Sequence, residues 1–155
     1  PIIIDFLKRG NIIYNSSLII RKKILDKVGL IDESENMISS EDFNLLLKIS
    51  DISNKFTYVP KSLCQYLVHS QNISKKNFDW SISARNAYRK YLHYLDRKSF
   101  LIKKIEFLYL KSKYYLLNKK YKKSLRLWII CVIKGNLKIK IKSAFLIIMY
   151  FFKKI

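Results

Sequence analysis

Glycine, proline and acidic residues are scarce in this sequence. Three Gly and two Pro in 155 residues leave few positions for tight turns, which favours long helices over strand-rich folds. The two cysteines, Cys64 and Cys131, form no C-x-x-C pair, which indicates neither a disulfide framework nor a zinc site and fits a reducing compartment. The longest wholly apolar run, residues 144–152, is roughly half the ~20 residues that cross a bilayer. What remains is a chain that is 50% hydrophobic and long enough to bury a core.

Positive charge is concentrated in the second half of the chain. The sequence carries 31 Lys and Arg against 11 Asp and Glu, a net charge of +20. Residues 97–155 contain 17 of these cations and one acidic residue, Glu106, whereas residues 1–78 contain 11 cations and 8 acidic residues. This distribution predicts two segments with different partners, the second facing phosphates of lipid or nucleic acid. A lysine-rich composition can also reflect an AT-rich coding sequence.

The hydrophobic pattern predicts a boundary near residues 75–79. Before it, we predict strands at 12–14 and 18–20, a short helix at 21–28, a second helix after residue 40, and extended segments at 57–59 and 63–67. After it, apolar side chains recur every three or four residues, which predicts a helical hairpin and a basic amphipathic last helix. The expected fold is an α/β segment over residues 1–78, followed by an all-α extension over residues 79–155.

Two adjacent carboxylates, Glu41 and Asp42, stand at the start of the helix predicted after residue 40. Asp42 has a structural interpretation, because Ser39-x-x-Asp42 matches a capping box in which Ser39 caps the helix and Asp42 reaches back to its backbone. It also has a chemical interpretation, because a carboxylate near the positive end of a helix dipole can accept the proton of an attacking sugar hydroxyl. The capping-box pattern alone leaves both open.

Five short fragments follow one another along residues 10–74. They are Gly10-Asn11 through Asn15-Ser16-Ser17 to Lys22, Leu25-x-x-Val28-Gly29 to Glu33, Glu41-Asp42-Phe43-Asn44-Leu45, Tyr58-Val59-Pro60-x-x-Leu63, and Tyr66-x-x-His69 to Ser74. Each fragment is weak alone, but the ordered set is fairly specific. In order and spacing it resembles family 2 nucleotide-sugar glycosyltransferases. The resemblance covers about residues 5–74 and implies the acceptor-side, C-terminal half of a glycosyltransferase domain with the A-type fold.

The resemblance implies roles for individual residues. Asp42 matches the family's catalytic base, and Glu41 would orient the acceptor or the base. His69 matches a histidine that helps to hold the divalent metal, Mg²⁺ or Mn²⁺, on the donor diphosphate; a lone histidine near a strand end is otherwise an ordinary surface residue. Three small polar residues match the corner that lines the donor and acceptor cleft in the family: Asn15, Ser16 and Ser17. Such residues are also common turn formers.

The motifs of the family's nucleotide-binding half do not occur in this sequence. No Asp-x-Asp metal motif and no glycine-rich nucleotide loop occurs in the sequence, which also lacks an initiator Met and a secretory signal pattern. Ile31, Leu47 and Leu67 depart from the residues usual in the family, which affects the acceptor contacts more than the base. We therefore expect the C-terminal portion of an inverting glycosyltransferase, which moves a sugar from a nucleotide sugar to a glycan or lipid-linked acceptor and is inactive without its other half.

The basic last segment, residues 137–155, has two interpretations. Its lysines and large apolar residues predict docking on an anionic membrane surface at the cytoplasmic side, and a helix packed on the hairpin is the alternative. The residues concerned are Lys138, Lys140, Lys142, Lys153 and Lys154 beside Phe145, Leu146, Ile147, Ile148, Tyr150 and Phe151.

The whole chain also has an alternative function, as a basic helical protein that binds nucleic acid. Its pI near 10 and the aromatic residues Tyr114, Tyr115 and Tyr121 are compatible with that function. The spacing of the three tyrosines fits a core stripe better than an exposed stacking surface, and no recognised nucleic-acid-binding motif is present.

Overall fold

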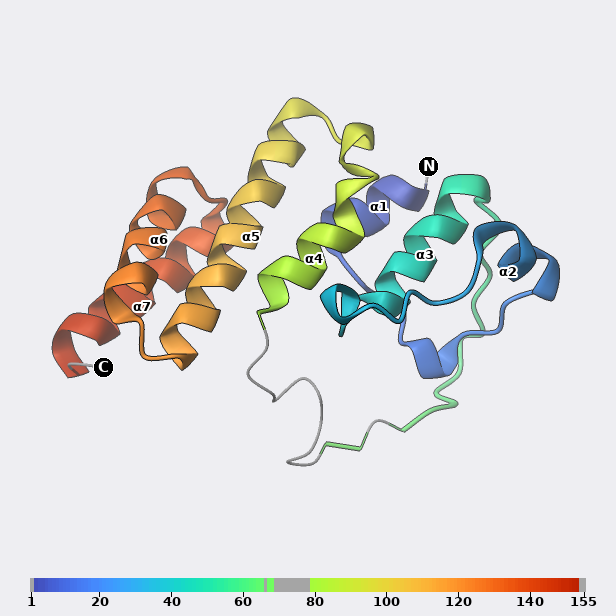
Figure 1. Ribbon diagram of the computed structural model, residues 1–155, viewed down its shortest axis with the longest axis horizontal. Coiled ribbons are helices and arrows are strands. Elements are labelled where there is room, and N and C mark those ends of the chain that lie inside the picture. The colour runs from blue at the N-terminus through green and yellow to red at the C-terminus, as the bar shows by residue number, and fades with distance from the viewer. Residues whose placement is uncertain (1, 66, 69–78, 154–155) are drawn as a thin grey trace. The chain divides into compact units, whose positions relative to one another are not determined.

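The computed structural model describes residues 2–65, 67–68 and 79–153, and within these ranges every regular element is a helix (Figure 1). The chain divides into two compact units, Pro1–Lys76 with Asn86–Leu95 and Asn77–Arg85 with Asp96–Ile155. The α-helices are α1 (Ile2–Arg9), α2 (Lys22–Val28), α3 (Glu41–Ile52), α4 (Trp80–Arg89), α5 (Arg97–Leu117), α6 (Tyr121–Lys134) and α7 (Leu137–Lys153). Three short 3₁₀ helices accompany them: η1 (Asn15–Ser17), η2 (Glu35–Met37) and η4 (Leu92–Tyr94).

The α/β fold predicted for residues 1–78 is wrong. Residues 12–14 and 18–20 flank η1 with extended backbone at Tyr14 and Leu18, but the described ranges contain no strand for them to pair with. Residues 57–59 and the described part of 63–67 are likewise irregular. A strand needs hydrogen bonds from a neighbouring strand, so strand-like sequence without such a neighbour stays extended and unpaired.

In the first unit, α1 and α3 share an apolar core. Ile3, Phe6 and Leu7 lie three and four residues apart on one face of α1, and all three are buried. Phe43, in the first turn of α3, places its ring 6.4 Å from Phe6 and 5.0 Å from Tyr88. These ring contacts fix the start of α3 against α1, so the two residues that precede Phe43 are held on an ordered element.

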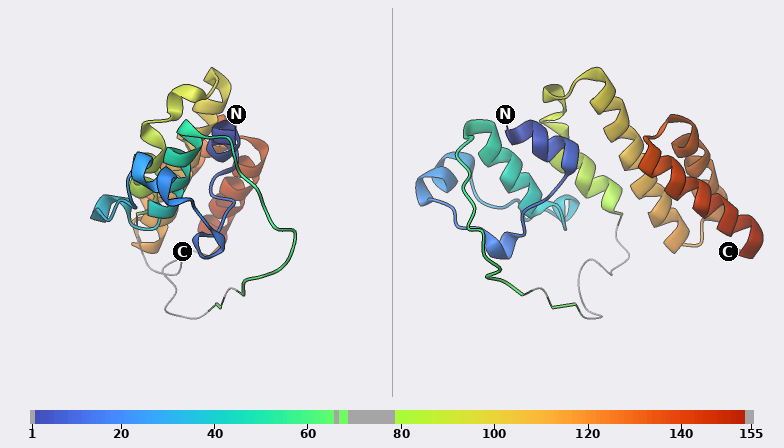
Figure 2. Two further views of the ribbon diagram at one scale, coloured as in Figure 1. Left: turned by 90° about the vertical axis from the view of Figure 1, so that its right-hand side faces the viewer. Right: turned by 180° about the vertical axis from the view of Figure 1, so that it is seen from behind.

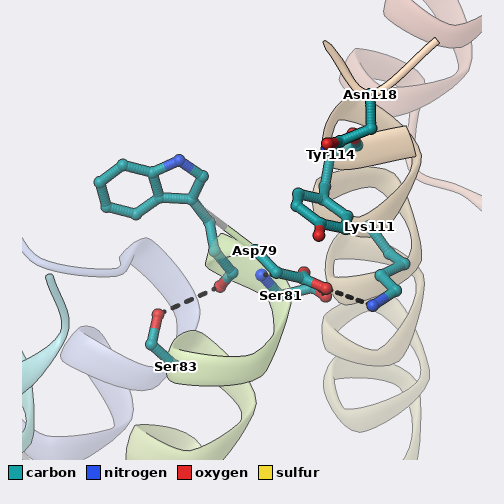
Figure 3. Close-up of polar contacts among 7 residues, drawn as sticks. Asp79, Ser81, Ser83, Lys111, Tyr114 and Asn118 are labelled. Carbon is teal, nitrogen blue, oxygen red and sulfur yellow. Dashed lines mark hydrogen bonds and ion pairs between the residues drawn. The ribbon is translucent and has the colours of Figure 1, made fainter. Parts of the chain in front are cut away.

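The helical character predicted beyond Asp79 is present, as α4 to α7. The Asp79 carboxylate precedes the first residue of α4, where it accepts a hydrogen bond from the Ser81 backbone N–H at 3.2 Å and forms an ion pair with Lys111 of α5 (Figure 3). A carboxylate in this position satisfies a backbone donor of the first helical turn. The same side chain therefore caps the start of α4 and, through Lys111, joins it to α5 within the second unit.

Two side-chain contacts join α6 to α5 in this unit. The Ser124 hydroxyl donates to the Ser112 carbonyl oxygen at 2.8 Å, and the Cys131 thiol lies 3.9 Å from the Ile105 carbonyl oxygen. Ser112, Ser124 and Cys131 are fully buried. Small side chains at these positions let the two helices approach closely, and the side-chain oxygen and sulfur atoms still find partners.

The last helix, α7, packs against the α5–α6 hairpin of the second unit (Figure 2). Gly135 and Asn136 connect α6 to α7, and the Asn136 side-chain oxygen accepts a hydrogen bond from the Ile139 N–H at 3.0 Å. Ile139 is buried together with Ile105 and Cys131. Across the residues that the model describes, no helix combines the length and the apolar character needed to cross a membrane.

Candidate active site

The predicted base, Asp42, lies in the first turn of α3 and is half-buried. One of its carboxylate oxygens accepts a hydrogen bond from the Asn11 side-chain amide at 3.0 Å, and the other accepts from the Phe43 backbone N–H at 2.6 Å. Asn11 is 31 residues away in the sequence and belongs to the fragment that begins at Gly10. Two of the sequence fragments, Gly10-Asn11 and Glu41-Asp42, therefore meet through a direct side-chain contact.

The end of α1 brings Asn11 to this position. The Gly10 N–H donates to the Phe6 carbonyl oxygen at 2.8 Å, which closes the helix, and Gly10 then adopts a φ of +87°. Residues other than glycine rarely adopt this left-handed region. The chain can therefore turn sharply after α1 and return toward the first turn of α3, where Phe43 packs on Phe6.

The capping box predicted for Ser39 and Asp42 is not formed. The residue that precedes α3 is Ser40, and its side chain makes no capping hydrogen bond. Ser39 has a φ of +67°, and its buried hydroxyl has no hydrogen-bond partner among the described residues. Asp42 is thus oriented by Asn11 and by its neighbour's N–H, which leaves the chemical interpretation of this carboxylate in place.

Glu41, the other member of the acidic pair, is half-buried at the first position of α3. One of its carboxylate oxygens is buried, and no hydrogen bond to it is made in the described part of the chain. Within those ranges no hydrogen bond joins Glu41 to Asp42. The role implied for Glu41, orienting the acceptor or the base, stays a prediction, and Asn11 is a residue whose side chain contacts Asp42.

Asn15, Ser16 and Ser17 form the 3₁₀ helix η1 and are exposed. The Ser17 hydroxyl donates to the Tyr14 carbonyl oxygen at 2.7 Å, and the Cys64 thiol lies 3.8 Å from the Ser16 carbonyl oxygen. No hydrogen bond links the three residues to Asp42 within the described ranges. Their predicted role in lining a donor and acceptor cleft stays a prediction.

The predicted metal ligand, His69, lies outside the described residues. Among the residues that are described, no group of three or more His, Cys, Asp or Glu side chains is placed to hold a metal ion. The described side chains therefore do not by themselves fit the divalent ion that the resemblance implies, and no chemical step is assigned to it.

The Asp42 carboxylate has acceptor capacity to spare. An ionised carboxylate offers about four lone-pair sites on its two oxygens. The Asn11 amide and the Phe43 N–H occupy two of them, and the hydrogen bond from Asn11 lies in an exposed position. Among the described residues, these two contacts leave lone-pair sites on both Asp42 oxygens without a hydrogen bond.

The tyrosines considered for nucleic-acid stacking are half-buried in the second unit. The Lys111 ammonium lies 5.2 Å from the centre of the Tyr114 ring and 5.3 Å from that of Tyr115, and Lys123 lies 5.8 Å from the Tyr115 ring. The Tyr121 ring lies 6.5 Å from another aromatic ring of the same unit. These rings therefore have cationic and aromatic neighbours within their own unit.

Comparison of the chain with models of known protein families, with curated proteins and with solved structures gives no match.

Proposed function

We propose that this chain supplies the acceptor side and the general base of an inverting glycosyltransferase. The observation that carries the proposal is the hydrogen bond between Asn11 and Asp42, because it joins the first and third of the five ordered fragments. The substrates are a nucleotide sugar as donor and a glycan or lipid-linked acceptor, as the resemblance implies. The proposal assigns donor binding to a separate half, because no Asp-x-Asp motif and no glycine-rich nucleotide loop occurs in the 155 residues of this sequence.

Asp42 acts in this proposal on the acceptor hydroxyl. The hydroxyl oxygen attacks the anomeric carbon of the donor, the bond from that carbon to the diphosphate oxygen breaks, and the hydroxyl proton passes to Asp42. Inversion follows because attack and departure occur on opposite faces of the sugar. A positioned base of this kind contributes roughly 10²–10⁴-fold to the rate. Asn11 holds the carboxylate at one oxygen and is a positioning residue.

We also place the reaction at the cytoplasmic face of a membrane. The support is the basic second unit, whose cations suit an anionic surface, together with the lipid-linked acceptors that the resemblance allows. A divalent ion on the donor diphosphate, with His69 as one ligand, belongs to the same proposal as a prediction from sequence.

The test is Asp42→Asn in a polypeptide that joins this chain to its donor-binding half. The readout is release of nucleoside diphosphate from UDP-glucose, UDP-N-acetylglucosamine and GDP-mannose in the presence of acceptor. We expect kcat to fall by about two to four orders of magnitude with donor KM nearly unchanged, as loss of a general base predicts. Asn11→Ala should lower kcat less, because the base remains but is held less well.

Asp26→Asn is the matched control, since it removes one exposed carboxylate from α2. It should leave kcat unchanged. Near-normal turnover of Asp42→Asn together with a lower melting temperature would make Asp42 a structural residue and contradict the proposal.

A further inference from the structure

The last helix, α7, has two apolar faces. One consists of Leu137, Ile141, Phe145, Ile148 and Phe152, spaced by three and four residues, and we call these five residues the outer stripe. All five are exposed, from 54% for Ile148 to 84% for Phe152. At about 100° per residue they occupy one side of the helix. An exposed row of this size is unusual on a helix whose opposite side is already packed.

The opposite side of α7 provides the packing. Ile139 and Ser143 are buried, and Ile139 contacts the α5–α6 hairpin through Ile105 and Cys131. The helical wheel places Ile139 and Ser143 each about 160° from the centre of the outer stripe. The inner side therefore accounts for the attachment of α7 to its unit, and the outer stripe is not needed for it. Among the apolar residues named from the sequence, Leu146, Ile147 and Tyr150 are half-buried and do not belong to the stripe.

Exposed lysines border the outer stripe on both sides. Lys138 and Lys142 follow one edge of the stripe and Lys140 follows the other, all three on the surface. Their long side chains can keep the ammonium groups in water while their stems run along apolar surface. The stripe with its two lysine edges has the composition of a helix that lies in a membrane interface.

We propose that α7 docks in the plane of an anionic phospholipid surface, with the outer stripe among the acyl chains and the bordering lysines at the phosphates. Charge complementarity selects this partner, because residues 97–155 carry 17 cations and one acidic residue. A second copy of the chain would bring like-charged lysine edges together. Nucleic acid would pair with the lysines and leave the apolar outer stripe exposed. The inference does not rest on the proposed sugar transfer.

The test measures binding of the full chain to vesicles of phosphatidylglycerol with phosphatidylcholine and to vesicles of phosphatidylcholine alone. Binding should be much tighter to the anionic vesicles and should weaken as salt rises. The double variant Lys138→Gln/Lys142→Gln should bind the anionic vesicles about 30-fold more weakly, since each lysine near such a surface contributes about fivefold. Lys22→Gln/Lys23→Gln, which removes two exposed lysines from α2, is the matched control and should not change binding.

The apolar contribution is tested with Phe145→Ser, which should weaken binding by about tenfold or more because its ring no longer enters the interface. Leu101→Ser, at a residue of similar exposure on α5, is the matched control. Helical circular dichroism establishes that each variant is folded. The proposal is overturned by equal binding to both kinds of vesicle, by α7 variants that behave like their controls, or by no binding to the anionic vesicles. In the last case, dimerisation or binding to single-stranded nucleic acid would identify the partner of the outer stripe instead.

Discussion

Two tyrosines near Asp51 are held in their neutral form. The Tyr94 hydroxyl donates a hydrogen bond to the Asp51 carboxylate at 2.6 Å, and this bond raises the pKa of Tyr94. Burial raises the pKa of Tyr91, and the negative charge of Asp51 adds to that effect. Ionising either tyrosine would place a second negative charge beside the carboxylate, so the folded state favours the protonated phenol.

Because the pKa values of Tyr91 and Tyr94 are raised in the folded state, the free energy of unfolding should fall at alkaline pH. Below the ordinary tyrosine pKa near 10, both tyrosines are protonated in the folded and unfolded states, so their contribution is fully present. As pH rises above that value the unfolded chain releases its protons first, and the contribution is lost. Tyr94→Phe should therefore show a smaller fall of the urea midpoint between about pH 9 and about pH 11 than the unchanged chain. Tyr58→Phe, at an 81% exposed residue, should show the same fall of the urea midpoint as the unchanged chain. An identical pH dependence in both variants would mean that Tyr94 does not contribute to the loss of stability at alkaline pH.

The position of Asp42 at the start of a helix could be predicted from the sequence, whereas its side-chain contacts could not. Asp42 was predicted in the first turn of a helix, and it lies there. Its partner Asn11 was not predicted, because the contact spans 31 residues and depends on the packing of Phe43 on Phe6. Ser39 matched a cap by spacing alone, and a one-residue shift of the helix start placed Ser40 at the cap position instead.

At the scale of elements, the errors lie where structure depends on distant partners. The extended segments around η1 have the β-branched and aromatic residues of strands, but a strand is completed only by its neighbour. Helix α1 was not predicted, although Ile3, Phe6 and Leu7 have helical spacing, because eight residues that include three consecutive isoleucines do not distinguish a helix from a buried strand. Helices α5 to α7 are longer, and their repeated three- and four-residue spacing predicted them correctly.

The turn between α6 and α7 has room only for glycine. A Cβ atom on Gly135 would clash with the Cys131 carbonyl oxygen and lie 2.9 Å from the Ile139 Cγ2 atom. Both neighbours belong to the packed interior of the second unit, so neither can move without a cost. Gly135→Ala should therefore lower the free energy of unfolding by about 1–3 kcal/mol, measured by urea denaturation followed by helical circular dichroism.

Lys134→Ala is the control for this substitution, because it changes an exposed residue next to the same turn. Its effect should stay within about 0.5 kcal/mol. Equal effects of the two substitutions would mean that the turn relaxes freely around a Cβ atom.

At the scale of the whole molecule, the net charge of +20 opposes folding through repulsion among cations. Sodium chloride screens such repulsion, since the Debye length falls from about 10 Å at 0.1 M to about 3 Å at 1 M. We therefore expect the thermal midpoint of unfolding to rise with sodium chloride, and to rise less in Lys138→Gln/Lys142→Gln. A midpoint that falls with salt would show that specific ion pairs, such as Asp79 with Lys111, outweigh the general repulsion.

Two contacts between α5 and α6 fix the axial alignment of these helices within the second unit. Ser124 meets the Ser112 carbonyl and Cys131 meets the Ile105 carbonyl, so the paired positions are seven residues apart on each helix and run in opposite directions. Sliding α6 by one turn, about 5.4 Å, would break both contacts and leave the Ser124 hydroxyl buried without its acceptor, at a cost of about 1–3 kcal/mol. The hairpin therefore has one preferred axial alignment. Because Ile139 of α7 is buried together with Ile105 and Cys131, this alignment also brings together the two residues on which the last helix packs.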